Sequence, residues 1–289
     1  MKTSCSEETN WNPIISCSHR TAFTLIELLV VIAIGAILVM LLMPLSQGNT
    51  GCSPPGGNQC LYNLRQLAVA LNMYAQDNTD HMPWPNWGND PVSLPLVKGR
   101  QYPGWLYSGD IKANPLNFKN WQTNRLISLK TGAYWPYLQN SNLFLCPTDK
   151  RSPDPKSLWA QRDNKLSSYT MNGVAAFYPP NGVNSTFGYA TAKLTQVWSS
   201  AAIIQWEPDA NNPQNWRDGA SYPNAAAGIS RLHNQRGNMG CVDGHVVSIT
   251  IAQFDSITND PPKGTPGKGL GWWNPATPDG HGTQIGAQY

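Results

Sequence analysis

The residues of this sequence best suited to acid–base or metal chemistry are a histidine and several carboxylates in its C-terminal third. Nine residues separate His233 from Asp243, Gly244 follows Asp243, and Glu207 ends an apolar segment upstream. We expect His233 and Asp243 to approach each other across adjacent antiparallel strands, with Glu207 joining them from the preceding strand. Carboxylates and an imidazole at one place can ligate a metal ion. Glu207 and Asp243 are therefore the candidate metal ligands.

A simpler use of the same residues is structural. A hydrogen bond between His233 and Asp243 would lock the hairpin that carries them. We favour this interpretation over a metal site, and we expect the protein to bind no cofactor. The sequence contains no GxSxG, P-loop or HExxH motif, and each of these motifs marks a known catalytic or phosphate-binding mechanism. We therefore expect no catalytic residue and no enzymatic activity.

Six cysteines are present, of which Cys5 and Cys17 precede the most apolar segment. The other four are Cys52, Cys60, Cys146 and Cys241. None lies in a CxxC or in a Cys/His zinc spacing. Four cysteines allow three complete pairings, and the spacings do not choose between them. Four buried thiols are the other possibility.

The elements that position these residues are one helix and a group of late strands. Apolar residues recur at helical spacing over Leu61–Gln76, whereas Ala201–Trp206 reads as a buried strand. Apolar and polar residues alternate on both sides of Asp243-Gly244, a pair typical of a two-residue hairpin turn. Residues 82–121 read as a long loop rich in Trp, Pro and Asn. We expect its tryptophans to cover a small core, the alternative being that they stack on sugar rings.

Composition limits the classes of partner. Of 289 residues only 13% are charged, and the formal net charge is +3. No basic run or aromatic–basic array is present, so we expect no binding to nucleic acid. A weakly charged chain rich in Trp, Gly and Pro is typical of an exported domain that faces the cell envelope or the outside.

The stretch from Phe23 to Met43 is the most apolar part of the chain, with Glu27 as its one charge in 21 residues. A helix of about 20 apolar residues crosses a bilayer, where an acid costs about 2.5–3.5 kcal/mol. A cut just before Phe23 would create a cationic amine, which on a neighbouring copy could pair with Glu27. A conventional signal peptide is the alternative, but the apolar run is long for one, and no Ala-x-Ala site follows Met43.

The segment TAFTLIELLVVIAIGAIL, which ends at Leu38, resembles the class III signal of type IV pilins and type II secretion pseudopilins. The resemblance implies that a prepilin peptidase cuts between Ala22 and Phe23 and methylates the new N-terminal Phe23. Glu27 holds the place of the family's acid. The sequence departs from the family pattern at Ala22, where Gly is usual. The implied fold is α+β and pilin-like, with an N-terminal hydrophobic helix followed by a head that has an antiparallel sheet and long loops.

Further segments resemble landmarks of a pseudopilin-like group that carries the same signal. They are Cys60–Asn78, Trp135–Leu138, Cys146–Asp149, Ser167–Gly173 and the signature of His233, nine residues and Asp243-Gly244. The group's two recurrent cysteines match Cys60 and Cys146, so the resemblance implies a disulfide between them. Calcium stabilises a C-terminal loop of major pseudopilins and is the ion to consider here, but it takes about six to eight oxygens. Only Glu207, Asp209, Asp243 and nearby carbonyls are on offer.

The resulting prediction divides the chain into five segments: a leader (1–22), a transmembrane and assembly helix (23–46), a Pro/Gly break (47–59), a pilin-like head (60–260) and a Gly/Pro-rich C-terminal tail (261–289). Lys2 and Arg20 precede the helix, which favours a cytoplasmic N-terminus. We therefore expect a single-pass protein of the inner membrane with a periplasmic or extracellular head. Its expected partners are prepilin peptidase and other pilin or pseudopilin subunits, in a homo- or hetero-filament of a type II secretion pseudopilus or type IV pilus. The alternative is a permanently anchored module that binds a ligand such as a glycan.

Overall fold

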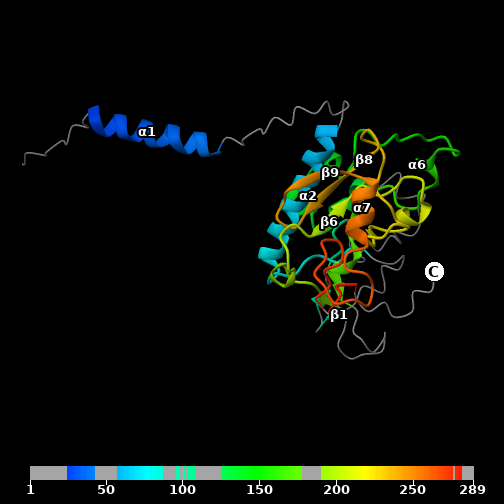
Figure 1. Cartoon of the computed structure of the whole chain (residues 1–289). Helices are drawn as coiled ribbons and strands as arrows, with labels where there is room; N and C mark the ends of the chain where they lie inside the picture. Colours follow the sequence, from blue (N-terminus) through cyan, green and yellow to red (C-terminus); the bar gives the residue numbers. More distant parts are fainter. Residues whose placement is uncertain are drawn as a thin grey trace, which may run out of the picture. The chain divides into compact units, whose positions relative to one another are not determined.

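The computed structural model describes residues 25–42, 57–86, 96–97, 100–101, 103–107, 125–177, 190–275 and 277–281. The chain divides into two compact units, Met1–Gly51 and Cys52–Tyr289 (Figure 1). The predicted cleavage residues Ala22 and Phe23, and residues 47–56 of the predicted break, lie outside the described residues.

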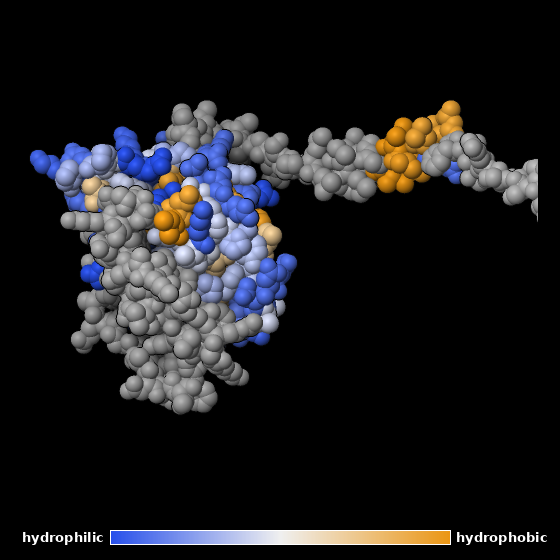
Figure 2. Space-filling view, turned by 180° about the vertical axis from the view of Figure 1, so that it is seen from behind, coloured by the Kyte–Doolittle hydropathy of each residue, from blue (hydrophilic) through white to orange (hydrophobic). Residues whose placement is uncertain are grey.

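The first unit contains the helix α1 (Leu25–Leu42), with Glu27 in its first turn. Its described side chains are all exposed, and the large apolar ones among them range from 77% at Leu25 to 51% at Val30. Figure 2 shows these residues as a strongly hydrophobic surface, whereas the visible described surface of the head is mainly hydrophilic. Among the residues that the structure describes, none forms a helix that is both long and apolar enough to cross a membrane.

The second unit, the head, has one long helix, short helical segments and short strands. The α-helices are α2 (Gly57–Asp77), α4 (Arg125–Lys130), α5 (Trp135–Leu138), α6 (Leu158–Gln161) and α7 (Ile251–Thr258), and the 3-10 helices are η2 (Ser141–Phe144), η3 (Gly173–Ala175), η4 (Leu194–Gln196) and η5 (Pro213–Trp216). The strands are β1 (Leu96–Val97), β2 (Arg100–Gln101), β3 (Thr170–Asn172), β4 (Ala176–Phe177), β5 (Ala190–Thr191), β6 (Ile203–Trp206), β7 (Ala220–Ser221), β8 (Arg236–Cys241) and β9 (Val246–Thr250).

The main sheet has five strands in the order β7-β3-β6-β8-β9. Three of its four pairings are antiparallel, but β7 pairs with β3 in parallel. The sheet is therefore mixed, and the prediction of an antiparallel sheet is wrong at this edge. The physical reason is the connection from β6 to β7 over residues 207–219, which skips past β3. The chain returns antiparallel to β6, and therefore parallel to β3. A tight hairpin would instead place β7 next to β6.

Helix α2 covers one face of this sheet. The predicted helix over Leu61–Gln76 is confirmed, and it begins earlier, at Gly57. Leu64, Leu67 and Leu71 recur at helical spacing and are completely buried in the larger core cluster. Gly57 follows the prolines of the predicted break, which cannot lie in a helix interior.

The second face of the sheet packs against α7 through a smaller cluster. This cluster contains Ile203, Trp206 and Phe254, and the rings of Trp206 and Phe254 lie 6.1 Å apart. Side chains three residues apart in a regular strand point to opposite faces. A register shift between Ile203 and Gln205 brings Ile203 and Trp206 to the same face. The residue after Trp206, which is Glu207, therefore points back toward the α2 side.

A hairpin is present at Asp243-Gly244, but its loop is longer than the two-residue turn predicted, since β8 ends at Cys241 and β9 begins at Val246. Strands β8 and β9 pair antiparallel, and the Cys241 amide donates to the His245 carbonyl at 2.9 Å. Gly244 has a φ of +87°, a left-handed conformation that costs glycine little.

Tryptophans from distant parts of the chain fill the head core. Trp84 and Trp105, from the predicted loop, are 4% and 0% exposed, so neither offers its ring face to a sugar. Trp272 and Trp273, from the predicted tail, are buried in the larger cluster, and the Trp273 indole donates to the Ile203 carbonyl. Residues 282–289 of that tail lie outside the described residues.

Candidate functional site

A disulfide at the N-terminal end of α2 is the centre of the most distinctive buried cluster. It joins Cys60 in α2 to Cys146, which follows η2, across 86 residues of sequence. Both residues are completely buried, and their Cα atoms lie 5.1 Å apart. This is the pair that the family resemblance implies.

Asn63, one turn along α2, fastens the same loop to the helix. Its side-chain amide donates to the Leu145 carbonyl at 2.8 Å and to the Tyr169 hydroxyl at 3.3 Å. Gln59 in turn donates to the Asn63 side-chain oxygen at 2.9 Å. The loop that carries Cys146 is thus held to α2 by a covalent bond and by neighbouring hydrogen bonds.

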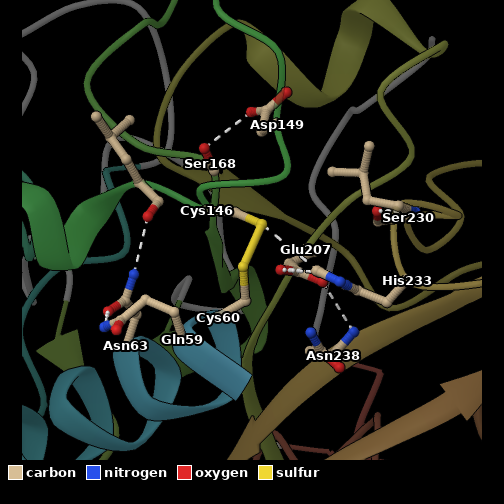
Figure 3. The surroundings of a disulfide bond; sticks show 12 residues. Gln59, Cys60, Asn63, Cys146, Asp149, Ser168, Glu207, Ser230, His233 and Asn238 are labelled. Carbon is tan, nitrogen blue, oxygen red and sulfur yellow. Dashed lines mark hydrogen bonds and ion pairs between the residues drawn. A yellow bond between two sulfur atoms is a disulfide. The ribbon is translucent and has the colours of Figure 1, made fainter. Parts of the chain in front are cut away.

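Glu207 and His233 lie on the other side of the disulfide from Asn63 (Figure 3). The His233 Nε2 atom lies 2.9 Å from the Glu207 Oε1 atom and 3.5 Å from the Cys146 Sγ atom. Glu207 is 1% exposed and His233 is 4% exposed. A carboxylate buried to this extent requires a partner, and the imidazole provides one.

The backbone holds both side chains in place. The Asn238 amide donates to the Glu207 Oε2 atom at 3.0 Å, and the Ser230 amide donates to the Glu207 carbonyl at 2.8 Å. His233 and Arg236 exchange backbone hydrogen bonds around a tight turn that leads into β8. Glu207 therefore keeps one oxygen committed to the backbone and directs the other at the imidazole.

The surroundings settle the tautomer of His233. Its Nδ1 atom is buried and has no hydrogen-bond partner among the described residues. A proton on Nε2 satisfies the Glu207 carboxylate, whereas a proton on Nδ1 would be an unsatisfied buried donor. Of the two neutral tautomers, the one with its proton on Nε2 therefore fits these surroundings better. Burial, and then the Glu207 charge, raise the pKa of the nearby Tyr169 well above its usual value.

Asp243 does not join this cluster. It lies in the β8–β9 turn, where its carboxylate accepts from the His245 amide at 3.0 Å and lies 2.5 Å from the His245 Nδ1 atom. Burial acts to raise its pKa, but the hydrogen bonds from His245 hold the pKa below its usual value. The six residues of β8, about 20 Å at 3.3 Å each, separate this turn from His233.

Two expectations therefore need correction. The predicted hydrogen bond between His233 and Asp243 is replaced by two separate pairs, His233 with Glu207 and Asp243 with His245. The candidate metal ligands Glu207 and Asp243 are not brought together. The reason is that His233 and Asp243 flank the two ends of one strand rather than facing each other from two strands.

A different set of potential ligands does converge. Single ligand atoms of Cys60, Cys146, Glu207 and His233 all lie within 4.8 Å of one another. The set offers sulfur and imidazole nitrogen with a single carboxylate, which does not suit calcium, an ion that prefers about six to eight oxygens. No spacing in the sequence links Cys146 to His233; membership of both in the same group of landmarks was the only available signal.

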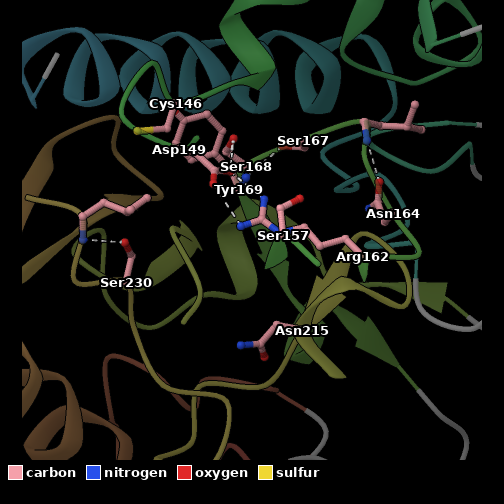
Figure 4. A network of polar contacts seen from close by, with 12 residues as sticks. Cys146, Asp149, Ser157, Arg162, Asn164, Ser167, Ser168, Tyr169, Asn215 and Ser230 are labelled. Atoms are coloured by element: carbon pink, nitrogen blue, oxygen red, sulfur yellow. Dashed lines mark hydrogen bonds and ion pairs between the residues drawn. The ribbon is translucent and has the colours of Figure 1, made fainter. Parts of the chain in front are cut away.

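A second buried network lies nearby and serves the fold (Figure 4). Asp149 and Arg162, both buried, form a two-pronged ion pair with contacts of 2.6 and 3.0 Å. The Ser168 hydroxyl donates to the same carboxylate at 2.8 Å, and the Arg162 guanidinium lies 3.5 Å from the centre of the Trp216 ring. Every charge of this network is paired within the protein, so it is not an open binding site.

Cys241 has a different environment from the bonded pair. It is a free cysteine in β8, 2% exposed. Burial, and then the Asp243 charge, raise the pKa of its thiol to about 12. Because the thiolate is the reactive form, this cysteine is inert at neutral pH.

Comparison with known proteins identifies one segment of the chain. Residues 17–43 match the family model of the prokaryotic N-terminal methylation motif. The chain therefore carries a prepilin-type signal, which implies a membrane-associated precursor that prepilin peptidase processes. No curated protein matches the chain, and no solved structure matches it.

Proposed function

We propose that the chain is a prepilin that matures into a structural subunit of a pilus-like filament, either a type II secretion pseudopilus or a type IV pilus. The observation that carries the proposal is the methylation motif at residues 17–43. The motif spans the expected cleavage site between Ala22 and Phe23 and the acid Glu27. Prepilin peptidase would remove residues 1–22 and methylate Phe23.

The exposed apolar surface of α1 supports an assembly role. Its described residues leave large apolar side chains 51–77% exposed, and an apolar surface of this kind marks a membrane or protein contact. The apolar sequence runs from Phe23 to Met43, which is long enough for a span of about 20 residues. Before assembly it would hold the subunit in the inner membrane, with the N-terminus cytoplasmic and the head periplasmic or extracellular.

Glu27 gives the helix its second role. The first turn of α1 carries this acid, which costs about 2.5–3.5 kcal/mol in hydrocarbon. In a filament, the methylated amine of Phe23 on a neighbouring copy would pair with the Glu27 carboxylate and offset that cost. The acid thereby favours subunit packing over lipid.

The head fits a structural subunit that works outside the cytoplasm. The disulfide between Cys60 and Cys146 is of a kind that persists in oxidising compartments. In the part of the head that the structure describes, each of the buried carboxylates of Glu207 and Asp149 has a partner within the head, His233 and Arg162 respectively. The arrangement suits a rigid head carried on an assembly helix.

Mass spectrometry of the mature N-terminus tests the proposal. The protein from membranes of a host with prepilin peptidase should begin at methylated Phe23, and in a peptidase-deficient strain it should keep residues 1–22. A matched variant, Glu27→Leu, should still be cut but should fail to co-assemble with filament subunits. An intact Met1 in both strains, or a cut beyond Met43, would show that the signal is not used.

A further inference from the structure

The buried cluster beside the disulfide offers the ligand types of a zinc site. Zinc in proteins takes thiolate, imidazole and carboxylate ligands, four in tetrahedral array at structural sites. We propose that the dithiol form of this chain binds one Zn²⁺ ion through Cys60, Cys146, Glu207 and His233. This site is separate from the proposed filament role, because it lies in the head and uses none of the signal residues.

The distances fit such a site. Bonds of about 2.0–2.3 Å to a tetrahedral zinc place the ligand atoms about 3.3–3.8 Å from one another. The four ligand atoms already lie within 4.8 Å of one another, with the His233 Nε2 atom 3.5 Å from the Cys146 Sγ atom and 2.9 Å from the Glu207 Oε1 atom. The two sulfur atoms, bonded in the oxidised chain, are the pair that must separate most.

Burial makes the site closed. The four residues are 0%, 0%, 1% and 4% exposed, so no coordination position is left for a substrate or for bulk water, as at structural zinc sites. The backbone amide of Asn238 donates to the Glu207 Oε2 atom, which leaves the Oε1 atom to bind the ion. Such outer contacts orient the ligands of zinc sites.

Zinc binding and disulfide formation use the same two sulfur atoms. In the newly made chain Cys60 and Cys146 are thiols, and zinc binding releases the protons of these two thiols to solvent. The proton on His233 moves from Nε2 to Nδ1, so that Nε2 is free to bind the ion. A small-molecule disulfide then oxidises the site. It takes two electrons from the Cys60 and Cys146 thiolates and two protons from solvent to become two thiols, while the Cys60–Cys146 bond forms and Zn²⁺ leaves to solvent. Zinc and the disulfide are thus alternative closures of the same loop.

Zinc loading of the full-length chain in detergent tests the inference. The chain is reduced with a phosphine, which becomes the phosphine oxide, mixed with zinc sulfate and desalted, and its zinc is measured by mass spectrometry. We expect about one zinc ion per reduced chain and none per oxidised chain. Zinc should also protect Cys60 and Cys146 from alkylation. Equal zinc in the oxidised and reduced chains would overturn the proposal.

Matched variants locate the ion. His233→Gln and Glu207→Gln should weaken zinc binding by at least about 100-fold, because even outer partners of zinc ligands change affinity by about 10–100-fold. His245→Gln is the control, since this imidazole is 45% exposed in the β8–β9 turn, and it should bind as the wild type does. Unchanged affinity in both folded glutamine variants would refute the assignment.

A spectrum of the wild-type chain decides the question if those variants do not fold. Cobalt(II) added to the reduced chain should give the intense bands of a tetrahedral ion with thiolate ligands. The weak spectrum of an octahedral ion would overturn the site.

Discussion

Removing the Cys60–Cys146 disulfide tests how far one covalent link supports the head. The double variant Cys60→Ala/Cys146→Ala opens a loop of 86 residues. The chain-entropy relation assigns such a loop about 4.6 kcal/mol. Both cysteines are completely buried, and their change to alanine removes only the two sulfur atoms. We therefore expect the lost link to dominate the effect, with a loss of about 3–5 kcal/mol in the free energy of unfolding.

Urea unfolding of the full-length chain in detergent, followed by tryptophan fluorescence, measures this loss. Cys241→Ala is the matched control, because this buried cysteine is free. The urea dependence should be steeper in the double variant, whose unfolded chain exposes more surface. A double variant within about 1 kcal/mol of the Cys241 control would refute the entropic reasoning.

Three further predictions concern single residues of the head. Asp149→Ala leaves the buried Arg162 charge without its carboxylate and should cost about 3–5 kcal/mol in urea unfolding. Gly244→Ala should cost about 1–2 kcal/mol in the same assay, because its φ of +87° is strained for alanine. A steric clash would add nothing, since no atom lies within 4 Å of the added methyl group. The pKa of Asp243 is lowered from 3.8 when the chain folds, so its contribution to stability is present above that pH and is lost as the pH falls through the lower folded value. The melting temperature of the wild type should therefore exceed that of Asp243→Asn at neutral pH, and the gap should close in acid; a gap that widens in acid would contradict the sign.

Elements with local signals could be predicted from the sequence. The helical period of leucines predicted α2, which buries Leu64 and Leu71 as expected. The Asp243-Gly244 pair predicted the hairpin, since the backbone of a tight turn demands a residue with a positive φ. Each of these signals lies within one short stretch of chain, so it reports interactions between residues that are close in the sequence.

Features that depend on long-range packing were not predictable in the same way. The parallel pairing of β7 rests on two residues, Ala220 and Ser221, too few for any periodicity. The approach of Glu207 to His233 depends on the register shift in β6, because that shift fixes which face of the sheet Glu207 occupies. The sequence predicted that Glu207 and His233 belong to adjacent strands, but it could not predict toward which face of the sheet each side chain points.

The geometry of β8 explains why a histidine and an Asp-Gly pair would stand nine residues apart. His233 is fixed at one end of the strand by Glu207, and Asp243-Gly244 closes the turn at the other end. Between these points the chain must make a tight turn and then the six residues of β8. Because side chains alternate between the faces of a strand, one added or lost residue would exchange the faces. Met239 packs toward α7, whereas His233 lies at the disulfide. With one residue more or fewer, these two side chains could not both keep their places. The spacing of nine residues is therefore the length of a strand whose two ends are both fixed.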